Sequence, residues 1–212
     1  GPGKEAWWYE NPRGEEKHWR KYLAFKPVEG ESPTFTDITG DGVPELVFNS
    51  KGHLGWASPN LKDLTWPWEF RKISPNLRFS RNHHGLGVGD VNNDGRMDVI
   101  ERSGWWEQPT SLKDYPEWRL HKWSFGDGAQ MHTYDVDGDG DSDVITSRSA
   151  HGYGIVWYEQ VFPWELFRLS EQRSRSNVRE VVETFERTRK AYDDIARQLA
   201  ELKAQEAPDQ NK

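Results

Sequence analysis

Three nine-residue segments of the chain share one pattern, and they constrain its fold more than any other feature. They begin at Asp37, Asp90 and Asp135 and read DITGDGVPE, DVNNDGRMD and DVDGDGDSD. Each places oxygen-bearing side chains at positions 1, 3, 5 and 9 and a glycine at position 6. Ca²⁺ takes six to eight oxygens at about 2.3–2.6 Å, and a tight loop turning at a glycine supplies them. The three copies predict up to three calcium sites.

The residues that flank these loops indicate strands. An EF-hand loop has 12 residues, closes with a glutamate at position 12 and lies between helices. Here the last carboxylate comes at position 9, and short apolar runs rich in β-branched and aromatic residues follow at 46–48, 99–100 and 144–145. Each loop is therefore predicted to join two strands.

A repeat of about fifty residues surrounds the loops. A tryptophan-rich segment follows each loop, and a segment of alternating polar and apolar residues comes next. A further copy of both segments precedes the first loop. The tryptophans that mark these two segments are Trp7, Trp56, Trp105 and Trp157 for the first, and Trp19, Trp68, Trp118 and Trp164 for the second. Four short strands per unit of forty to fifty residues are typical of a β-propeller blade. Most tryptophans are expected to fill the space between blades.

This combination resembles the FG-GAP/VCBS repeats of integrin-α-like β-propellers, bacterial ones especially, over residues 5–170. The resemblance is closest in GLGVGDVNNDG at 85–95 and GWWEQP at 104–109. It implies calcium ligands from the side chains at loop positions 1, 3, 5 and 9 and from the backbone carbonyl at position 7. These residues are Asp37, Thr39, Asp41, Val43 and Glu45 in the first loop, Asp90, Asn92, Asp94, Arg96 and Asp98 in the second, and Asp135, Asp137, Asp139, Asp141 and Asp143 in the third. Because Thr39 and Glu45 depart from the pattern, the first site is expected to be the weakest.

The predicted fold class is all-β: a partial β-propeller of about three and a half four-stranded blades, followed by a long C-terminal α-helix. The ranges are 5–28 for a partial blade, 33–74, 83–125 and 129–170 for full blades, 174–207 for the helix and 208–212 for a disordered tail. Residues 1–4 begin with Gly-Pro-Gly, which is typical of the remnant of an expression tag.

The helix prediction depends on a heptad pattern of apolar residues between Val178 and Leu202. Asn177 with Glu180 resembles a capping box, and Pro208 marks the end. The narrow apolar stripe fits either a helix packed on its own blades or a coiled coil between chains.

An incomplete propeller leaves open sheet edges. Three arrangements accommodate them: the chain is a fragment or half-propeller of a longer protein, two chains pair their edges in trans, or the C-terminal segment caps an arc. A homo-oligomer through the open edges or the helix is therefore expected.

Charge and composition limit the partners. The net charge is −7, which argues against a nucleic-acid partner, and three bound Ca²⁺ ions would bring it to about −1. No segment is long and apolar enough for membrane insertion, and no phosphate or dinucleotide motif indicates a further cofactor. Weak carboxylate loops fill in millimolar extracellular calcium, which predicts an extracytoplasmic location: secreted, periplasmic or on the cell surface.

Four histidines support an alternative interpretation, in which the chain is an enzyme. His83, His84, His132 and His151 precede or lie in predicted inner strands, or lie near a channel mouth, with Arg81 or Arg148 in reach. In that arrangement they could hold a transition-metal ion or act as a general base on a sugar, as expected of a carbohydrate-active enzyme of the lyase or dehydratase type found among some relatives with this blade type. The simpler reading is that these imidazoles bond backbone carbonyls, since no His-x-x-x-His spacing occurs.

The favoured interpretation is a non-catalytic, calcium-binding scaffold outside the cytoplasm that binds a glycan or a protein. The three complete ligand sets favour it over the enzyme.

Overall fold

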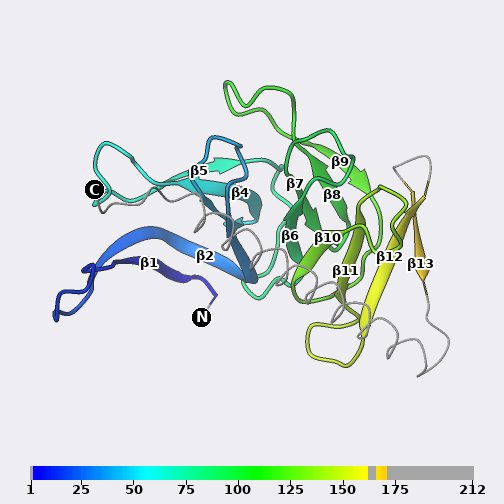
Figure 1. Cartoon of the computed structure of the whole chain (residues 1–212), viewed down its shortest axis with the longest axis horizontal. Helices are drawn as coiled ribbons and strands as arrows, with labels where there is room; N and C mark the ends of the chain where they lie inside the picture. Colours follow the sequence, from blue (N-terminus) through cyan, green and yellow to red (C-terminus); the bar gives the residue numbers. More distant parts are fainter. Residues whose placement is uncertain (1, 162–165, 171–212) are drawn as a thin grey trace, which may run out of the picture. The chain divides into compact units, whose positions relative to one another are not determined.

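The computed structural model describes residues 2–161 and 166–170, which fold as β-strands in three antiparallel sheets (Figure 1). The first sheet consists of β1 (Lys4–Glu10), β2 (Arg20–Thr36), β3 (Glu45–Ser50), β4 (His53–Ser58) and β5 (Glu69–Lys72). The second consists of β6 (Leu86–Gly89), β7 (Asp98–Glu101), β8 (Gly104–Glu107) and β9 (Arg119–Lys122). The third consists of β10 (Met131–Tyr134), β11 (Asp143–Ser147), β12 (Ile155–Val161) and β13 (Leu166–Ser170). In each sheet the strands follow one another in chain order.

The predicted fold class is wrong in its blade count. Residues 5–28 do not form a separate partial blade, because β2 runs without interruption from Arg20 to Thr36. Its first half pairs with β1 as far as Val28, and its second half pairs with β3 from Glu29 onward. One five-stranded sheet thus takes the place of a half blade and a full blade.

The predicted C-terminal helix is not supported. Its residues, 174–207, and the predicted tail at 208–212 lie outside the described residues, and the described part of the chain contains no helix. The chain divides into two units, Gly1–Ser170 and Glu171–Lys212, and the three sheets belong to the first. Over residues 2–161 and 166–170, no helix long and apolar enough to cross a membrane is found.

The three sheets meet along their inner strands, β2, β6 and β10. A parallel bridge joins Leu86 of β6 to Gln130, and the Gln130 side chain donates to Thr34 Oγ1 of β2 at 2.7 Å. Gly87 allows the close approach of β6 and β10, since a Cβ there would overlap the backbone carbonyl of Met131. The inner strands therefore contact one another directly at this level, where the sequence suggested a channel.

Two apolar clusters fill the spaces between neighbouring sheets. The cluster between the first and second sheets includes Trp56, Trp106 and Trp118, and the cluster between the second and third includes Trp105. All four are at least nine-tenths buried. For these four residues, the prediction that tryptophans pack between repeats is confirmed, and their burial stabilises the junctions through large apolar areas.

Candidate functional site

Each Asp-rich loop connects an inner strand to its neighbour, as the sequence predicted. The loops join β2 to β3, β6 to β7 and β10 to β11, and the carboxylate at position 9 is the first residue of the following strand. The second and third loops lie against each other, because Asn93 Nδ2 donates to the carbonyl of Gly140 at 2.7 Å. The Asn93 Oδ1 also accepts from the Ser142 hydroxyl at 3.2 Å.

The aspartate at position 1 gathers the backbone of each loop around its carboxylate. Asp37 Oδ1 accepts from the amide of Gly40 at 2.8 Å, and its Oδ2 accepts from Gly42 at 2.8 Å. Asp90 and Asp135 accept two backbone amides each in the corresponding way, at 2.7–3.1 Å. The loops thus share a tight turn in which the position-1 carboxylate accepts backbone amides from positions 4 to 6.

The carboxylate at position 9 is the buried end of each loop. Glu45, Asp98 and Asp143 are at most 1% exposed, and each accepts the backbone amide of position 2 at 3.0–3.1 Å. Burial raises the pKa of all three, that of Asp98 to about 7. Because burial disfavours the charged form, a cation next to these groups would relieve the cost of keeping them ionised.

A glutamine connects the second loop to the first, which sequence reasoning missed. The backbone amide of Gln108, just after β8, donates to Asp98 Oδ1 at 2.8 Å. Its side-chain Nε2 donates to the carbonyl of Ile38, at position 2 of the first loop, at 2.6 Å. Gln108 is 5% exposed, so these bonds lie within the junction of the two sheets.

Gln160 makes the same connection from the third loop to the second. Its amide donates to Asp143 Oδ1 at 2.8 Å, and its Nε2 donates to the carbonyl of Val91 at 3.1 Å. The signal in the sequence was a Glu-Gln pair that recurs at 107–108 and 159–160, near the end of the second strand after each of these two loops. Each glutamine therefore links the position-9 carboxylate of its own loop to the loop of the preceding sheet through two hydrogen bonds.

The third loop brings three carboxylates to a common focus. Oxygens of Asp135, Asp137 and Asp139 all lie within 4.8 Å of one another, a spacing at which one metal ion can contact them together. Asp141, at position 7, adds a fourth negative group. Burial and the neighbouring Asp139 raise the pKa of Asp141 to about 6.

The second loop carries an internal cation where the third has a carboxylate. Arg96 at position 7 forms an ion pair with Asp94 Oδ2, and its Nε donates to the carbonyl of Gln108 at 3.0 Å. Asn92 also donates to Asp94 Oδ2 at 2.9 Å. The second loop is therefore partly neutralised by its own side chains.

The first loop has three carboxylates and no cation. Thr39 replaces the position-3 acid or amide, and its hydroxyl donates to Glu45 Oε1 at 3.2 Å. Asp41 accepts the position-7 amide of Val43 at 2.8 Å, as the position-5 aspartates of the other loops do. The prediction that this site is the weakest stays a prediction.

The structure brings together two of the four candidate histidines. The rings of His84 and His151 meet edge to face with centroids 4.7 Å apart, while His132 is exposed on β10 and lies in no metal-ligand cluster of the described residues. His83 is 5% exposed and packs against Phe79 with centroids 3.9 Å apart. Burial lowers the pKa of His83 to about 4, so this imidazole is neutral at physiological pH.

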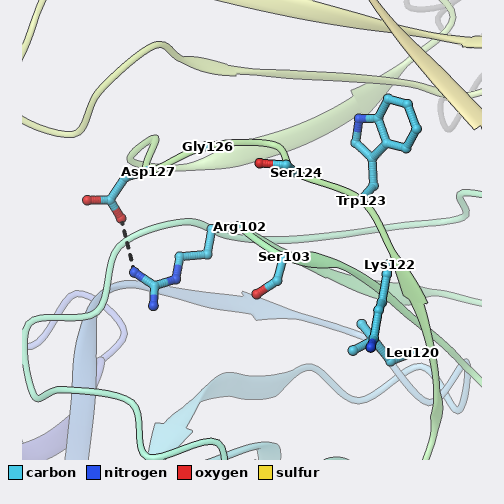
Figure 2. Close-up of a pocket in the computed structure, with 8 residues that line it drawn as sticks. All are labelled: Arg102, Ser103, Leu120, Lys122, Trp123, Ser124, Gly126 and Asp127. Atoms are coloured by element: carbon cyan, nitrogen blue, oxygen red, sulfur yellow. Dashed lines mark ion pairs between the residues drawn. The ribbon is translucent and has the colours of Figure 1, made fainter.

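A shallow groove of about 560 Å³ lies beside the turn between β7 and β8 and the connection from β9 to β10. Figure 2 shows Arg102, Lys122 and Trp123 among its lining residues, with Arg102 paired to Asp127 at 3.7 Å. The Trp123 ring points away from the Lys122 ammonium and the Arg102 guanidinium, and it packs against Phe167 with ring centroids 5.9 Å apart, so the groove offers a ligand two cations rather than an aromatic face.

Comparison with known protein families supports the repeat. Residues 37–100 match the family model of the FG-GAP-like repeat, a stretch that contains the first two loops. This confirms the FG-GAP resemblance over residues 37–100 and supports a repeat module of the β-propeller type. Neither the curated proteins nor the solved structures gave a match to this chain.

Proposed function

We propose that the three sheets form a calcium-binding repeat module of the β-propeller type. The observation that carries the proposal is the convergence of Asp135, Asp137 and Asp139 above the buried Asp143, in a backbone arrangement that the other two loops share. Carboxylate and carbonyl oxygens at this density are ligands that Ca²⁺ prefers. The first two loops lie in the FG-GAP-like segment, which supports the same assignment.

Calcium serves a structural role in this proposal. Each loop closes a turn between the inner strand and its neighbour. Gln108 and Gln160 each donate a hydrogen bond to the loop of the preceding sheet. An ion at each turn holds the inner strands in register. The module acts as a non-catalytic scaffold outside the cytoplasm, where millimolar Ca²⁺ fills sites with dissociation constants of about 10⁻⁴–10⁻³ M.

The calcium proposal is tested by thermal unfolding with and without a chelator. Saturating Ca²⁺ is expected to raise the Tm, since an ion that binds only the folded state at about 100 times its Kd adds about 2.7 kcal/mol of stability. In the double variant Asp135→Asn and Asp139→Asn, Ca²⁺ should raise the Tm by less than in the parent chain, because the third loop no longer contributes.

Glu16→Gln is the matched control, because Glu16 is an exposed acid outside the loops. It should respond to calcium like the parent chain. Identical melting curves of the parent chain in chelator and in millimolar Ca²⁺ would contradict the proposal, as would a double variant that keeps the full response.

We further propose that the ligand is an acidic glycan and that it binds the groove of Arg102 and Lys122. Guanidinium and ammonium groups pair with sulfate or carboxylate. In titration with a sulfated oligosaccharide, Lys122→Ala should weaken binding about tenfold and leave the melting temperature of the chain unchanged. Lys113→Ala, an exposed cation outside the groove, should bind like the parent. A protein ligand is indicated instead if no acidic oligosaccharide binds.

Pairing of open edges between two chains also stays a proposal. Solution mass by light scattering tests it, and a strictly monomeric chain at all concentrations would contradict it.

A further inference from the structure

A second group of metal-ligating side chains lies apart from the calcium loops. It consists of Glu31, His84 and His151, which we call the His–Glu cluster. Each comes from a different sheet: Glu31 from β2, His84 from the segment that leads into β6, and His151 from the connection between β11 and β12. The calcium loops follow the C-terminal ends of β6 and β10, whereas His84 precedes β6, so the cluster lies toward the opposite ends of the inner strands.

The three side chains are close enough to share one ion. His84 Nδ1 lies 3.6 Å from Glu31 Oε2, and one ligand atom from each residue lies within 4.8 Å of the others. In a tetrahedral zinc site with bonds of about 2.0–2.2 Å, neighbouring ligand atoms are about 3.4 Å apart. The widest pair would therefore close by at most about 1.4 Å, which side-chain rotation alone can supply.

Backbone hydrogen bonds hold the segments that carry the cluster. The amide of Glu31 donates to the carbonyl of His83 at 2.9 Å, which fixes β2 beside the residue preceding His84. Gly85 donates to the carbonyl of Ala129 at 3.0 Å, and Ala150 donates to the carbonyl of Asp127 at 2.8 Å. The residue next to each of the two imidazoles is thus tied to the 127–129 segment, and the cluster is pre-organised.

The chemistry of the donors selects the ion. Two imidazole nitrogens and one carboxylate are ligands for Zn²⁺ and other first-row divalent metals, whereas Ca²⁺ requires oxygen. His84 is only partly exposed and the other two are accessible, so one or more coordination positions would remain for water. Three protein ligands with an open position match the zinc coordination of an accessible site.

We propose that Glu31, His84 and His151 bind one divalent transition-metal ion, with Zn²⁺ as the reference ion. Because each ligand belongs to a different sheet, the ion cross-links all three sheets at the ends away from the calcium loops. This site is independent of the proposed calcium binding. Its effect on the protein is to stabilise the arrangement of the three inner strands, since a metal that binds only the folded state adds its binding energy to folding.

The test is calorimetric titration of the calcium-saturated chain with Zn²⁺. One equivalent of Zn²⁺ is expected to bind. Loss of a group that only supports a metal ligand weakens metal affinity about 10- to 100-fold. His84→Ala and His151→Ala each remove a ligand, so each should weaken the Zn²⁺ affinity of the chain by more than that. Substitution of Co²⁺ gives an independent reading, because absorption bands from a site with nitrogen ligands should appear in the parent chain and vanish in both variants.

Two matched controls separate this site from other zinc binding. His132→Ala and His18→Ala remove exposed histidines outside the cluster and should bind Zn²⁺ like the parent. The double variant Asp135→Asn and Asp139→Asn should also keep the zinc affinity, which distinguishes failure here from failure of the calcium proposal. Absence of binding, unchanged binding in His84→Ala, or equal loss in His132→Ala would each overturn the proposal.

Thermal unfolding provides a readout of the cross-link. At about 100 times its Kd, Zn²⁺ should raise the Tm of the parent chain by about 5–10 °C and leave that of His84→Ala unchanged. A circular dichroism spectrum equal to that of the parent verifies that the variant folds. Equal rises in Tm for the parent and the variant would contradict the cross-link.

Discussion

The second and third loops have the same backbone arrangement but different electrostatics. In both, the position-1 aspartate accepts two backbone amides, and the position-9 aspartate accepts two more. At position 7, however, the second loop has Arg96, which pairs with Asp94, and the third has Asp141, which adds to a cluster of acids. The second loop supplies part of its own positive charge, and the third has no cation among its own residues.

The comparison distinguishes the loop residues that form the turn from those that set its charge. Hydrogen bonds from the backbone to the carboxylates at positions 1 and 9 form the turn, and they are alike in both loops. The side chains at positions 3 and 7 set the net charge of the loop, and they differ: Asn92 and Arg96 in the second loop, Asp137 and Asp141 in the third. Keeping the turn while changing its charge allows one repeat to produce sites of unequal affinity.

Removal of a position-9 carboxylate should have the largest effect. Asp98→Ala leaves the buried amides of Val91 and Gln108 without an acceptor, at about 1–3 kcal/mol each, so a loss of about 2–6 kcal/mol in unfolding free energy is expected. Asp94→Ala in the same loop removes an exposed group and should cost about 1 kcal/mol or less in chelator. Urea denaturation with a chelator present measures both. Equal losses would erase the distinction between turn-forming and ion-binding positions.

The pH dependence of the calcium-free protein should have an intermediate effect. The raised pKa of Asp98, about 7, means that the folded state holds a proton that the unfolded state releases near its ordinary value of 3.8. Stability from this group is complete below about pH 4 and declines as pH rises through 7, with a slope of up to about 1.4 kcal/mol per pH unit.

His83 acts in the opposite direction, and the comparison must remove its contribution. Its lowered pKa, about 4, makes the folded state lose stability as pH falls from about 6.5 to 4. The difference between the parent chain and Asp98→Asn cancels this contribution. In chelator, the parent should lose stability relative to Asp98→Asn as pH rises from 5 to 8, and a flat difference would refute the assignment.

Neutralising the charge at position 7 should have the smallest effect, and it should change calcium affinity in opposite directions in the two loops. Arg96→Gln frees Asp94 from its ion pair and should strengthen calcium binding at the second loop up to about tenfold, or about 1.4 kcal/mol. Asp141→Asn removes a negative charge and should weaken binding at the third loop by a similar factor. Calcium titration calorimetry at low ionic strength measures both changes. Changes of the same sign would contradict the electrostatic difference between the loops.

Much of the candidate calcium site could be predicted from the sequence, because its parts are neighbours in the chain. The nine-residue pattern predicted which oxygens belong together, and in the third loop Asp135, Asp137 and Asp139 do come within 4.8 Å of one another. The apolar runs after the loops predicted the following strands. The FG-GAP resemblance was likewise carried by contiguous residues, and the family match at 37–100 bears it out. The charge difference between Arg96 and Asp141 was also readable, although the pairing of Arg96 with Asp94 was not.

The strand boundaries in the first sheet were predicted incorrectly for a physical reason. The predicted ranges, 5–28 and 33–74, placed a boundary between residues 28 and 33, a region that contains or adjoins the turn signals Pro27, Gly30 and Pro33. In the structure β2 continues through them, because it exchanges its partner β1 for β3 at this point and its ladder is irregular between Glu29 and Thr34. At this change of partner the amides of Gly30 and Glu31 leave the ladder and donate to the carbonyls of Arg81 and His83 at 2.7 and 2.9 Å, and prolines and glycines are tolerated where the ladder is interrupted.

The sequence by itself determined the composition of the loops and the order of turn and strand, since these depend on residues within a few positions of one another. Tertiary structure alone decided which distant groups meet. Gln108 reaches Ile38 across a sheet junction, and Glu31, His84 and His151 converge from three sheets. Such contacts arise from the packing of the sheets on one another, and packing is a property of the whole unit that no local pattern encodes.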